Sequence, residues 1–501
     1  MATTPRSPTR VRRRCTPAPA SRLVPPRGCV APRRIASNFA ALSAAEVVCR
    51  ITSVAVTLML AKSLGAAGYG RIEFAFNVVF WLVLIVRDAF EGIVVRELAR
   101  HPRLIRPLVN HVLAVKGLLA LGLFTGLALI GALTLSSAAD RAIFALYGLL
   151  LLTTALGLDF VYRGTERMAL VALSLCIRTM IYAAGVWFWV GDPTRIVWVP
   201  AWLALGEACG IGLVWLCYSR QNGLPRPVLG LRFLWVFLRR GRSVCLIQVA
   251  QTVIGSADLM VVGLMSPWAD VGRYGATHRM VASLLTFGLI FQQVTFPMLA
   301  RSWRQAPVAG RASLNALIQV LTIGLIPAAV GGAVLSVPLV RFLLPGDEYA
   351  GAGLLLALGI WRAPLLTLAY LYQTTLIAVN RESAGVRLLS AGALGSGPLV
   401  GVFCWAFGPP GASVAVLIIA LGLVVAGYGC LAREGRQPAW HHHLTRPLAA
   451  SLAMVPVCLL LQRWHVALAV AGGAAVYLLT LAAMGGLHPS QLRAILLPAK
   501  R

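Results

Sequence analysis

The chain has 501 residues, of which 58% are hydrophobic and 12% are charged, whereas soluble domains are about 45–50% apolar and about 25% charged. This composition excludes a water-soluble globular protein of this length. The net charge of +29 does not indicate a nucleic-acid-binding protein, because the basic residues are spread between apolar stretches and form no single patch.

The apolar stretches predict an all-α polytopic membrane protein with about fourteen transmembrane helices. A bilayer core about 30 Å thick is crossed by about 20 apolar residues in a helix, and an open chain satisfies its backbone groups in lipid only as helix. In chain order the predicted spans are 36–62, 75–95, 108–131, 142–162, 168–190, 196–217, 243–266, 277–299, 314–342, 350–378, 384–406, 411–431, 447–462 and 466–486. The span 314–342 is unusually long, and Pro327 and Pro338 predict that it kinks.

The distribution of positive charge predicts the orientation. The predicted spans divide the loops between the two sides of the membrane. Most of the 45 Lys and Arg residues lie in the tails and loops on the side that holds the N-terminus. The positive-inside rule therefore places both termini in the cytoplasm. Residues 1–35 contain many arginines and no acidic residue, and we expect them to form a disordered basic cytoplasmic tail.

A short internal repeat predicts how the spans are grouped. LGAAGYGRIEF (64–74) precedes a span and RELAR (96–100), much as DVGRYGATHRM (270–280) precedes a span and PMLAR (297–301). The copies are six spans apart, so they share one orientation in the membrane, as in transporters built from two parallel lobes. The predicted units are an N-terminal six-helix lobe (36–217), a basic cytoplasmic linker (218–242), a C-terminal six-helix lobe (243–431) and an additional helix pair (447–486).

These motifs resemble those of Wzx-type polysaccharide flippases in the multidrug/oligosaccharidyl-lipid/polysaccharide exporter superfamily. The resemblance covers residues 36 to 485 and also includes RDAFEGIVVRELAR (87–100), LDFVYRGTERM (158–168), ADLMVVGL (257–264) and FLLPGDEYAGAG (342–353). It implies a V-shaped transporter with two six-helix lobes and two further helices.

The same resemblance implies a substrate, a location and partners. Wzx-type proteins move oligosaccharides linked to undecaprenyl pyrophosphate across the bacterial cytoplasmic membrane for surface polysaccharides such as lipopolysaccharide O-antigen or exopolysaccharide. Membrane lipid, glycosyltransferases and a polysaccharide polymerase are the expected partners. No cofactor is implied.

Charged residues inside the predicted spans mark the candidate functional positions. Such residues cost about 2.5–3.5 kcal/mol each at the centre of a span, so they face the bundle interior, form pairs or line a pathway. Three structural pairs are expected. Glu46 with Arg50, and Arg87 with Glu91, are four residues apart on one helix face. Asp88 and Lys116 lie at matching depths on neighbouring spans.

Arg178 and Arg362 lie near the middle of their spans with no acidic residue within one turn. Because a guanidinium offers paired donors that match phosphate, we predict that both contact the pyrophosphate head group, with Arg50 and Lys116 as further candidates. The alternative is that they pair with Glu207 or Asp258. Four acidic residues are candidates for ion pairing or for binding a coupling Na⁺ or proton: Asp258, Glu207, Asp88 and Glu46.

Two other functions remain open from the sequence. A multidrug exporter of the same superfamily would have mainly acidic residues in its spans, whereas acids and bases are nearly balanced here. A polysaccharide polymerase or membrane glycosyltransferase is the alternative from a different class. However, no external loop is long, the linker 218–242 contains no Asp or Glu, and no GxxxxGK[ST] motif is present.

The sequence predicts no catalytic residue and no metal site. The histidine triplet 441–443 has no neighbouring Cys or carboxylate residues with the spacing of metal ligands.

Overall fold

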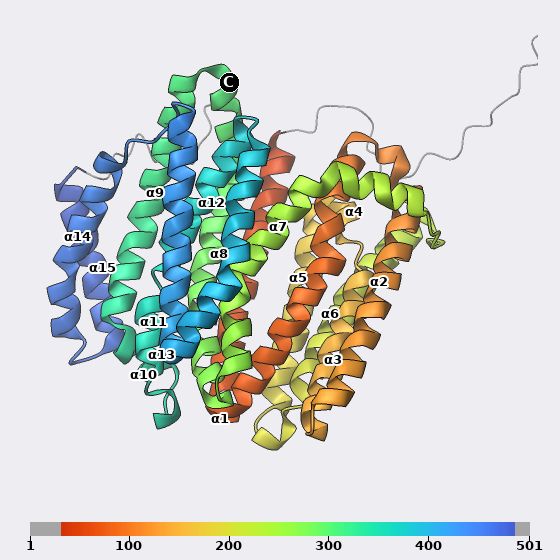
Figure 1. The fold of residues 1–501 in the computed structure, drawn as a ribbon, viewed down its shortest axis with the longest axis horizontal. Helices are drawn as coiled ribbons and strands as arrows, with labels where there is room; N and C mark the ends of the chain where they lie inside the picture. The colour runs from red at the N-terminus through yellow and green to blue at the C-terminus, as the bar shows by residue number, and fades with distance from the viewer. Residues whose placement is uncertain (1–31, 486–501) are drawn as a thin grey trace, which may run out of the picture.

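The computed structural model describes residues 32–485, and the side chains of some helical residues, among them Asp88 and Gln293, lie outside the described residues. The described chain is helical (Figure 1). Its α-helices are α1 (Pro32–Arg100), α2 (Ile105–Thr134), α3 (Ala138–Ala155), α4 (Asp159–Gly164), α5 (Met168–Trp189), α6 (Trp198–Asn222), α7 (Leu231–Met265), α8 (Trp268–Gln305), α9 (Pro307–Val334), α10 (Ser336–Leu343), α11 (Ala352–Gly359), α12 (Arg362–Ala378), α13 (Glu382–Arg433), α14 (Trp440–Leu461) and α15 (Val466–Ala483). Short 3-10 helices η1 (Pro102–Leu104), η2 (Pro193–Arg195) and η3 (Asp347–Tyr349) connect some of them.

The number of membrane crossings agrees with the prediction. In the described chain eleven helical segments are long and apolar enough to cross a bilayer, and α8, which bends by 42°, makes twelve. Helices α1 and α13 contain 69 and 52 residues and each is interrupted by a glycine with positive φ, Gly65 (69°) and Gly408 (66°). Glycine adopts this conformation without a steric penalty. Counting each half of α1 and α13 as one crossing gives fourteen.

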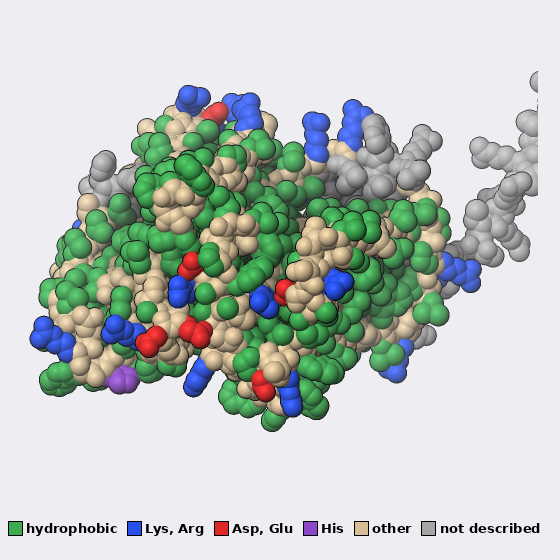
Figure 2. Space-filling model, turned by 60° about the horizontal axis from the view of Figure 1, so that its bottom comes forward, with side chains coloured by type: hydrophobic (Ala, Val, Ile, Leu, Met, Phe, Trp, Pro, Cys, Tyr) green, Lys and Arg blue, Asp and Glu red, His purple; other side chains and the backbone are tan. Residues whose placement is uncertain are grey.

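The outer surface shows that lipid surrounds the helices. Large apolar side chains are exposed, including Trp405 (81%), Phe188 (77%) and Leu394 (79%), and soluble monomers rarely expose continuous apolar surface of this kind. In Figure 2 hydrophobic side chains cover the flanks, and acidic and basic side chains gather on the end that is turned forward. The chain is therefore a multi-pass membrane protein.

The helices form two bundles that approach each other at the Gly65 end, giving a V shape (Figure 1). Lobe one contains α1–α6 and lobe two contains α7–α13. Helices α14 and α15 pack on the outer side of α9, where the Tyr477 hydroxyl donates a 2.7 Å hydrogen bond to the Ile323 carbonyl. Between the lobes, α6 continues to Asn222 and α7 begins at Leu231, so helix extends from both sides into the predicted linker.

Glycines allow the lobes to touch at the Gly65 end. A Cβ atom on Gly70 of α1 would collide with the carbonyl oxygen of Trp268, and a Cβ atom on Gly272 of α8 would collide with the carbonyl oxygen of Ala66. The two copies of the internal repeat therefore cross with their backbones in contact. Beside this crossing, the Ala66 N–H donates a 2.7 Å hydrogen bond to the Glu348 carboxylate of lobe two. The lobes are closed at this end.

We expect Gly272→Val to destabilise the closed arrangement, because the new side chain would occupy the space of the Ala66 carbonyl. Overpacking of this kind typically costs about 1–3 kcal/mol. The measurement is the thermal unfolding temperature of the purified protein in detergent. Gly324→Ala is the matched control, since a Cβ atom there meets nothing within 4 Å. Equal unfolding temperatures for the two variants would contradict the close crossing.

The long predicted span 314–342 breaks at one of its two prolines. Pro327 lies inside α9, which continues to Val334. The break is at Leu335, and Pro338 is the third residue of α10. Proline has no N–H to donate to the carbonyl four residues earlier and its ring clashes with that carbonyl; for Pro338 this residue is Val334, where α9 ends.

Candidate substrate cavity

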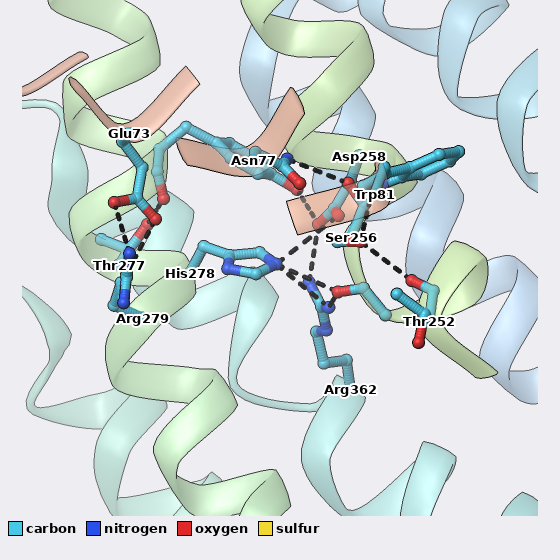
Figure 3. A network of polar contacts seen from close by, with 12 residues as sticks. Glu73, Asn77, Trp81, Thr252, Ser256, Asp258, Thr277, His278, Arg279 and Arg362 are labelled. Atoms are coloured by element: carbon cyan, nitrogen blue, oxygen red, sulfur yellow. Dashed lines mark hydrogen bonds and ion pairs between the residues drawn. The ribbon is translucent and has the colours of Figure 1, made fainter. Parts of the chain in front are cut away.

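One face of the second half of α1 joins the two lobes. Glu73, Asn77 and Trp81 are spaced four residues apart, so they lie on the same helix face (Figure 3). The Asn77 side chain donates to the Ser256 carbonyl at 3.3 Å, and the Trp81 indole donates to the Ser256 hydroxyl at 2.9 Å. Because Ser256 belongs to α7, these bonds connect lobe one directly with lobe two.

The strongest polar contact between the lobes is the pair Glu73–Arg279. Arg279 of α8 donates through Nε and Nη2 to the two carboxylate oxygens at 2.8 and 3.0 Å, and the Tyr69 hydroxyl donates to the same carboxylate at 3.0 Å. The guanidinium also lies 4.7 Å from the centre of the Phe76 ring. Paired charge-assisted bonds of this geometry are strong and directional. The Glu73 side chain is buried, whereas Arg279 is 30% exposed.

A central chamber of about 500 Å³ lies beside this pair and is lined by both lobes. Its volume is in the usual range for a ligand site, about 300–1,000 Å³. Lobe one contributes α1 residues and lobe two contributes residues of α7, α8 and α12; the polar side chains include Arg50, Thr57, Gln251, His278, Arg279 and Tyr370. The closed Gly65 end lies on one side of the chamber.

Arg50 is the notable cation of this chamber. It is exposed and lines the chamber wall. Within the described residues its charge interacts with Glu46 and is repelled by Arg279, without a hydrogen bond or ion pair. The predicted ion pair between Glu46 and Arg50 is therefore wrong. Arg50 lines the central chamber, whereas Glu46 lines a neighbouring chamber, called the lobe-one chamber because most of its lining comes from lobe one; Arg87 and Gln248 line both.

The lobe-one chamber, about 530 Å³, contains the first of the two predicted mid-depth arginines. Arg178 of α5 makes ion pairs with Asp159 at 2.7 Å and with Glu207 at 3.1 Å. Two carboxylates share one guanidinium, so this triad carries a net negative charge when all three groups are ionised. Glu91 and Glu46 line the same chamber.

The second mid-depth arginine belongs to a buried cluster in lobe two. Arg362 of α12 donates to the Asp258 carboxylate at 2.6 Å, and the Tyr274 hydroxyl donates to the same oxygen at 2.7 Å. Asp258 is fully buried and Arg362 is 4% exposed. His278 of α8 lies between this cluster and the central chamber.

The structure thus pairs Arg178 with Glu207 and Arg362 with Asp258, which was the alternative to direct head-group contact. Lys116 is fully buried in lobe one, 5.5 Å from the centre of the Phe160 ring, and does not line the central chamber. The Asp88 side chain lies outside the described residues, so its pairing with Lys116 stays a prediction.

The sequence interpretation missed Glu73, Asn77, His278 and Arg279. The signal was present in the internal repeat, because Glu73 and His278 each follow a tyrosine by four residues in the two copies. Among the residues that the structure describes, no three His, Cys, Asp or Glu side chains gather as metal ligands. The side chains of the histidine triplet 441–443 lie outside that part.

Residues 35–303 match the family model described as "Polysaccharide biosynthesis protein". The chain belongs to this family. A search among curated protein sequences gave no match for this member of the polysaccharide biosynthesis protein family.

Solved structures show which fold this family member has. It is similar to "Lipid II flippase MurJ, inward closed conformation", with a TM-score of 0.73 and 15% identity over 88% of this chain and 98% of that one. It is also similar to an inward-facing multidrug resistance MATE family transporter of the MOP superfamily, with a TM-score of 0.62 and 12% identity over 77% of this chain and 94% of that one. At these identities the likeness establishes the shared fold of two lobes.

Proposed function

We propose that the protein is a flippase that moves a lipid-linked oligosaccharide, carried on undecaprenyl pyrophosphate, across the bacterial cytoplasmic membrane for surface polysaccharide synthesis. Both termini lie in the cytoplasm in this proposal. Family membership supports a role in polysaccharide biosynthesis, and the two-lobed fold supports transport by alternating exposure of a central site. The protein performs no covalent chemistry and uses no cofactor.

The observation that carries the proposal is the unpaired guanidinium of Arg50 in a chamber lined by both lobes. A cation without a partner inside a membrane protein is costly unless it serves an anion. Arg279 lies in the same wall, and Coulomb repulsion from it acts on Arg50. The two arginines offer several donors to one pyrophosphate. In this proposal Arg50 and Arg279 hold the head group, while Arg178 pairs with Asp159 and Glu207 and Arg362 pairs with the buried Asp258.

An apolar pocket on lobe two supports a lipid substrate. It lies between α9, α12, α13 and α14 and is lined almost entirely by apolar side chains, including Leu325, Leu365, Leu368 and Leu448. Helix α12 presents Tyr370 to the central chamber and Leu365 and Leu368 to the pocket. A head group in the chamber and an isoprenoid chain in the pocket would lie on opposite sides of α12.

The test is transport by the purified protein in proteoliposomes loaded with an undecaprenyl-pyrophosphate oligosaccharide. We expect the glycan to become accessible to an added glycosidase faster than in protein-free liposomes. Arg50→Gln should slow this about 10-fold or more, because a hydrogen bond to a charged group contributes about 1.5–3 kcal/mol. Arg195→Gln is the control, since Arg195 lies in the η2 turn outside the chambers.

The second candidate function is export of cationic drugs. The lobe-one chamber favours it, because four acids line that space with three arginines, which leaves a small excess of acidic side chains: Glu46, Glu91, Asp159 and Glu207 against Arg87, Arg163 and Arg178. A lipophilic cationic dye offered to the same proteoliposomes separates the two functions. Dye uptake that depends on Glu207, without movement of the glycolipid, would replace the flippase proposal. Glycosyltransferases and a polymerase are the expected partners of the flippase only.

A further inference from the structure

His278 connects the central chamber with the buried cluster of lobe two. Its side chain is 11% exposed and lines the chamber. Its Nε2 atom lies 3.6 Å from Oδ1 of Asp258, 3.1 Å from the Gly255 carbonyl oxygen and 3.3 Å from Nη2 of Arg362 (Figure 3). One end of the imidazole ring therefore faces the cluster while the residue remains accessible from the chamber.

The two oxygens of Asp258 are used unequally. Oδ2 accepts hydrogen bonds from both Arg362 and Tyr274, whereas Oδ1 accepts none within the described residues. Buried carboxylate oxygens are normally satisfied, and this side chain is fully buried. Nε2 of the His278 ring lies 3.6 Å from Oδ1. The cluster therefore holds a vacant acceptor next to a histidine.

The groups around Nε2 fit both neutral tautomers of the ring. A guanidinium has donors and no acceptor, so in the 3.3 Å contact Arg362 donates to an Nε2 that carries no hydrogen. The Gly255 carbonyl at 3.1 Å and Oδ1 of Asp258 at 3.6 Å are the acceptors for an Nε2 that carries one. The imidazolium carries hydrogen on both nitrogens, so its Nε2 can donate to these two acceptors, beside the second cation Arg362.

The charge of the cluster changes with this one proton. Asp258 and Arg362 cancel when His278 is neutral, and the cluster gains one positive charge when His278 is protonated. Histidine is the side chain whose charge ordinarily changes between about pH 5 and 8. The other charged or titratable groups around the ring and its chamber are Asp258 on α7, Arg362 and Tyr370 on α12, Tyr274 and Arg279 on α8, and Glu73, Arg50 and Arg87 on α1.

We propose that His278 is a proton-binding site beside the pair of Asp258 and Arg362, so that transport responds to a proton gradient. The response of transport to the gradient rests on the proposed function, whereas proton binding by His278 does not. A sodium ion at Asp258 would have to displace a buried guanidinium from Oδ2, and hard cations need several oxygen ligands. His278 offers Asp258 a second cation without removing the first.

The position of His278 links the proton to the contact between the lobes. The next residue on α8, Arg279, reaches across to Glu73 of lobe one, whereas His278 faces the cluster of lobe two. Protonation adds a positive charge next to Arg279 and draws this turn of α8 toward Asp258 on α7. Both effects act on the same helix turn that holds the lobes together.

The first experiment measures proton binding directly, without a transport substrate. Infrared difference spectra of the full chain in lipid nanodiscs, recorded across about pH 5 to 8, should contain an imidazole signal that is absent in His278→Gln. His111→Gln is the matched control, because His111 lies near the start of α2, where its ring contacts the Val228 carbonyl. Identical difference spectra for wild type and His278→Gln would overturn the proposal.

A second variant keeps the test decisive should His278→Gln fold poorly. Asp258→Leu combined with Arg362→Met removes both charged groups beside the ring and retains the histidine. We expect the imidazole signal to change in frequency, because the ring loses its carboxylate acceptor and its guanidinium neighbour. An unchanged signal would show that the ring does not interact with the cluster and would overturn the proposal.

The transport part uses the same proteoliposomes as above with an imposed proton or sodium gradient. A proton gradient should accelerate glycolipid movement several-fold in wild type and in His111→Gln, and not in His278→Gln. A sodium gradient is the comparison, and sodium-driven acceleration that His278→Gln abolishes would overturn the proton coupling. Absence of glycolipid movement under every gradient would refute the proposed function, while the infrared spectra decide the proton site independently.

Discussion

Replacement of Arg279 with glutamine is expected to reduce export of surface polysaccharide to background. The change removes a cation from the central chamber and leaves the buried Glu73 without its partner across the lobe interface. Removing one member of a buried, hydrogen-bonded ion pair costs about 3–5 kcal/mol, which corresponds to at least a 100-fold effect on an equilibrium. The measurement is polysaccharide output in cells whose own flippase gene is replaced, normalised to the amount of protein in the membrane.

Two further variants serve as controls for Arg279→Gln. Arg304→Gln changes another arginine of α8, an exposed one that donates to the Ala300 carbonyl of its own helix, and should export normally. Arg279→Lys retains the charge but loses the paired geometry toward Glu73, so an intermediate output is expected. Normal output from Arg279→Gln at a normal protein level would contradict both the interlobe and the head-group roles.

Asp258→Asn is expected to prevent accumulation of folded protein. The variant leaves Arg362 ionised and buried with no carboxylate beside it, and such a loss typically costs about 3–5 kcal/mol, a large part of the stability of most proteins. The amount of monodisperse protein after detergent extraction and its unfolding temperature are the measurements.

The combined change Asp258→Leu and Arg362→Met should restore folding, because apolar replacement of a complete buried pair is often neutral or stabilising. Glu207→Gln provides a comparison in lobe one. Its effect should be milder, because Arg178 keeps its 2.7 Å ion pair with Asp159. Equal losses in Asp258→Asn and in the double variant would show that the cluster contributes packing and not charge compensation.

The sequence was sufficient for the architecture. Hydropathy and the internal repeat predicted fourteen crossings in two parallel lobes, and the bends at Gly65 and Gly408 in α1 and α13 agree with separate spans on each side. Hydropathy did not distinguish a glycine-rich loop from a glycine-rich helix crossing. The segments 63–74 and 267–276 were read as loops, yet α1 resumes immediately after Gly65 and α8 begins at Trp268. Small residues serve helix contact there.

That misreading explains which site residues were missed. Glu73 fell in a segment read as a loop and Arg279 at the very start of a predicted span, so neither was considered among the charges inside the spans, although the structure pairs them at the lobe interface. The partners of Arg178 and Arg362 were among the candidates, because few acids lie at that depth. The choice between pairing and head-group contact depended on distances between helices far apart in sequence, and the spacing within one helix carries no such information. Arg50 shows the same limit, since spacing alone predicted its pair with Glu46.

The glycine crossing between α1 and α8 has a consequence for the speed of the transport cycle. Where two helices meet through interlocked side chains, separation forfeits many dispersion contacts at once and raises the activation barrier. At Gly70 and Gly272 the backbones meet without intervening side chains. Rotation of the two helices about this contact therefore breaks few side-chain contacts. A small rotation there is magnified along helices that reach the opposite membrane surface. The rate of reorientation is then governed by the polar contacts at Glu73 and Ser256, which a bound anion or a proton is able to weaken.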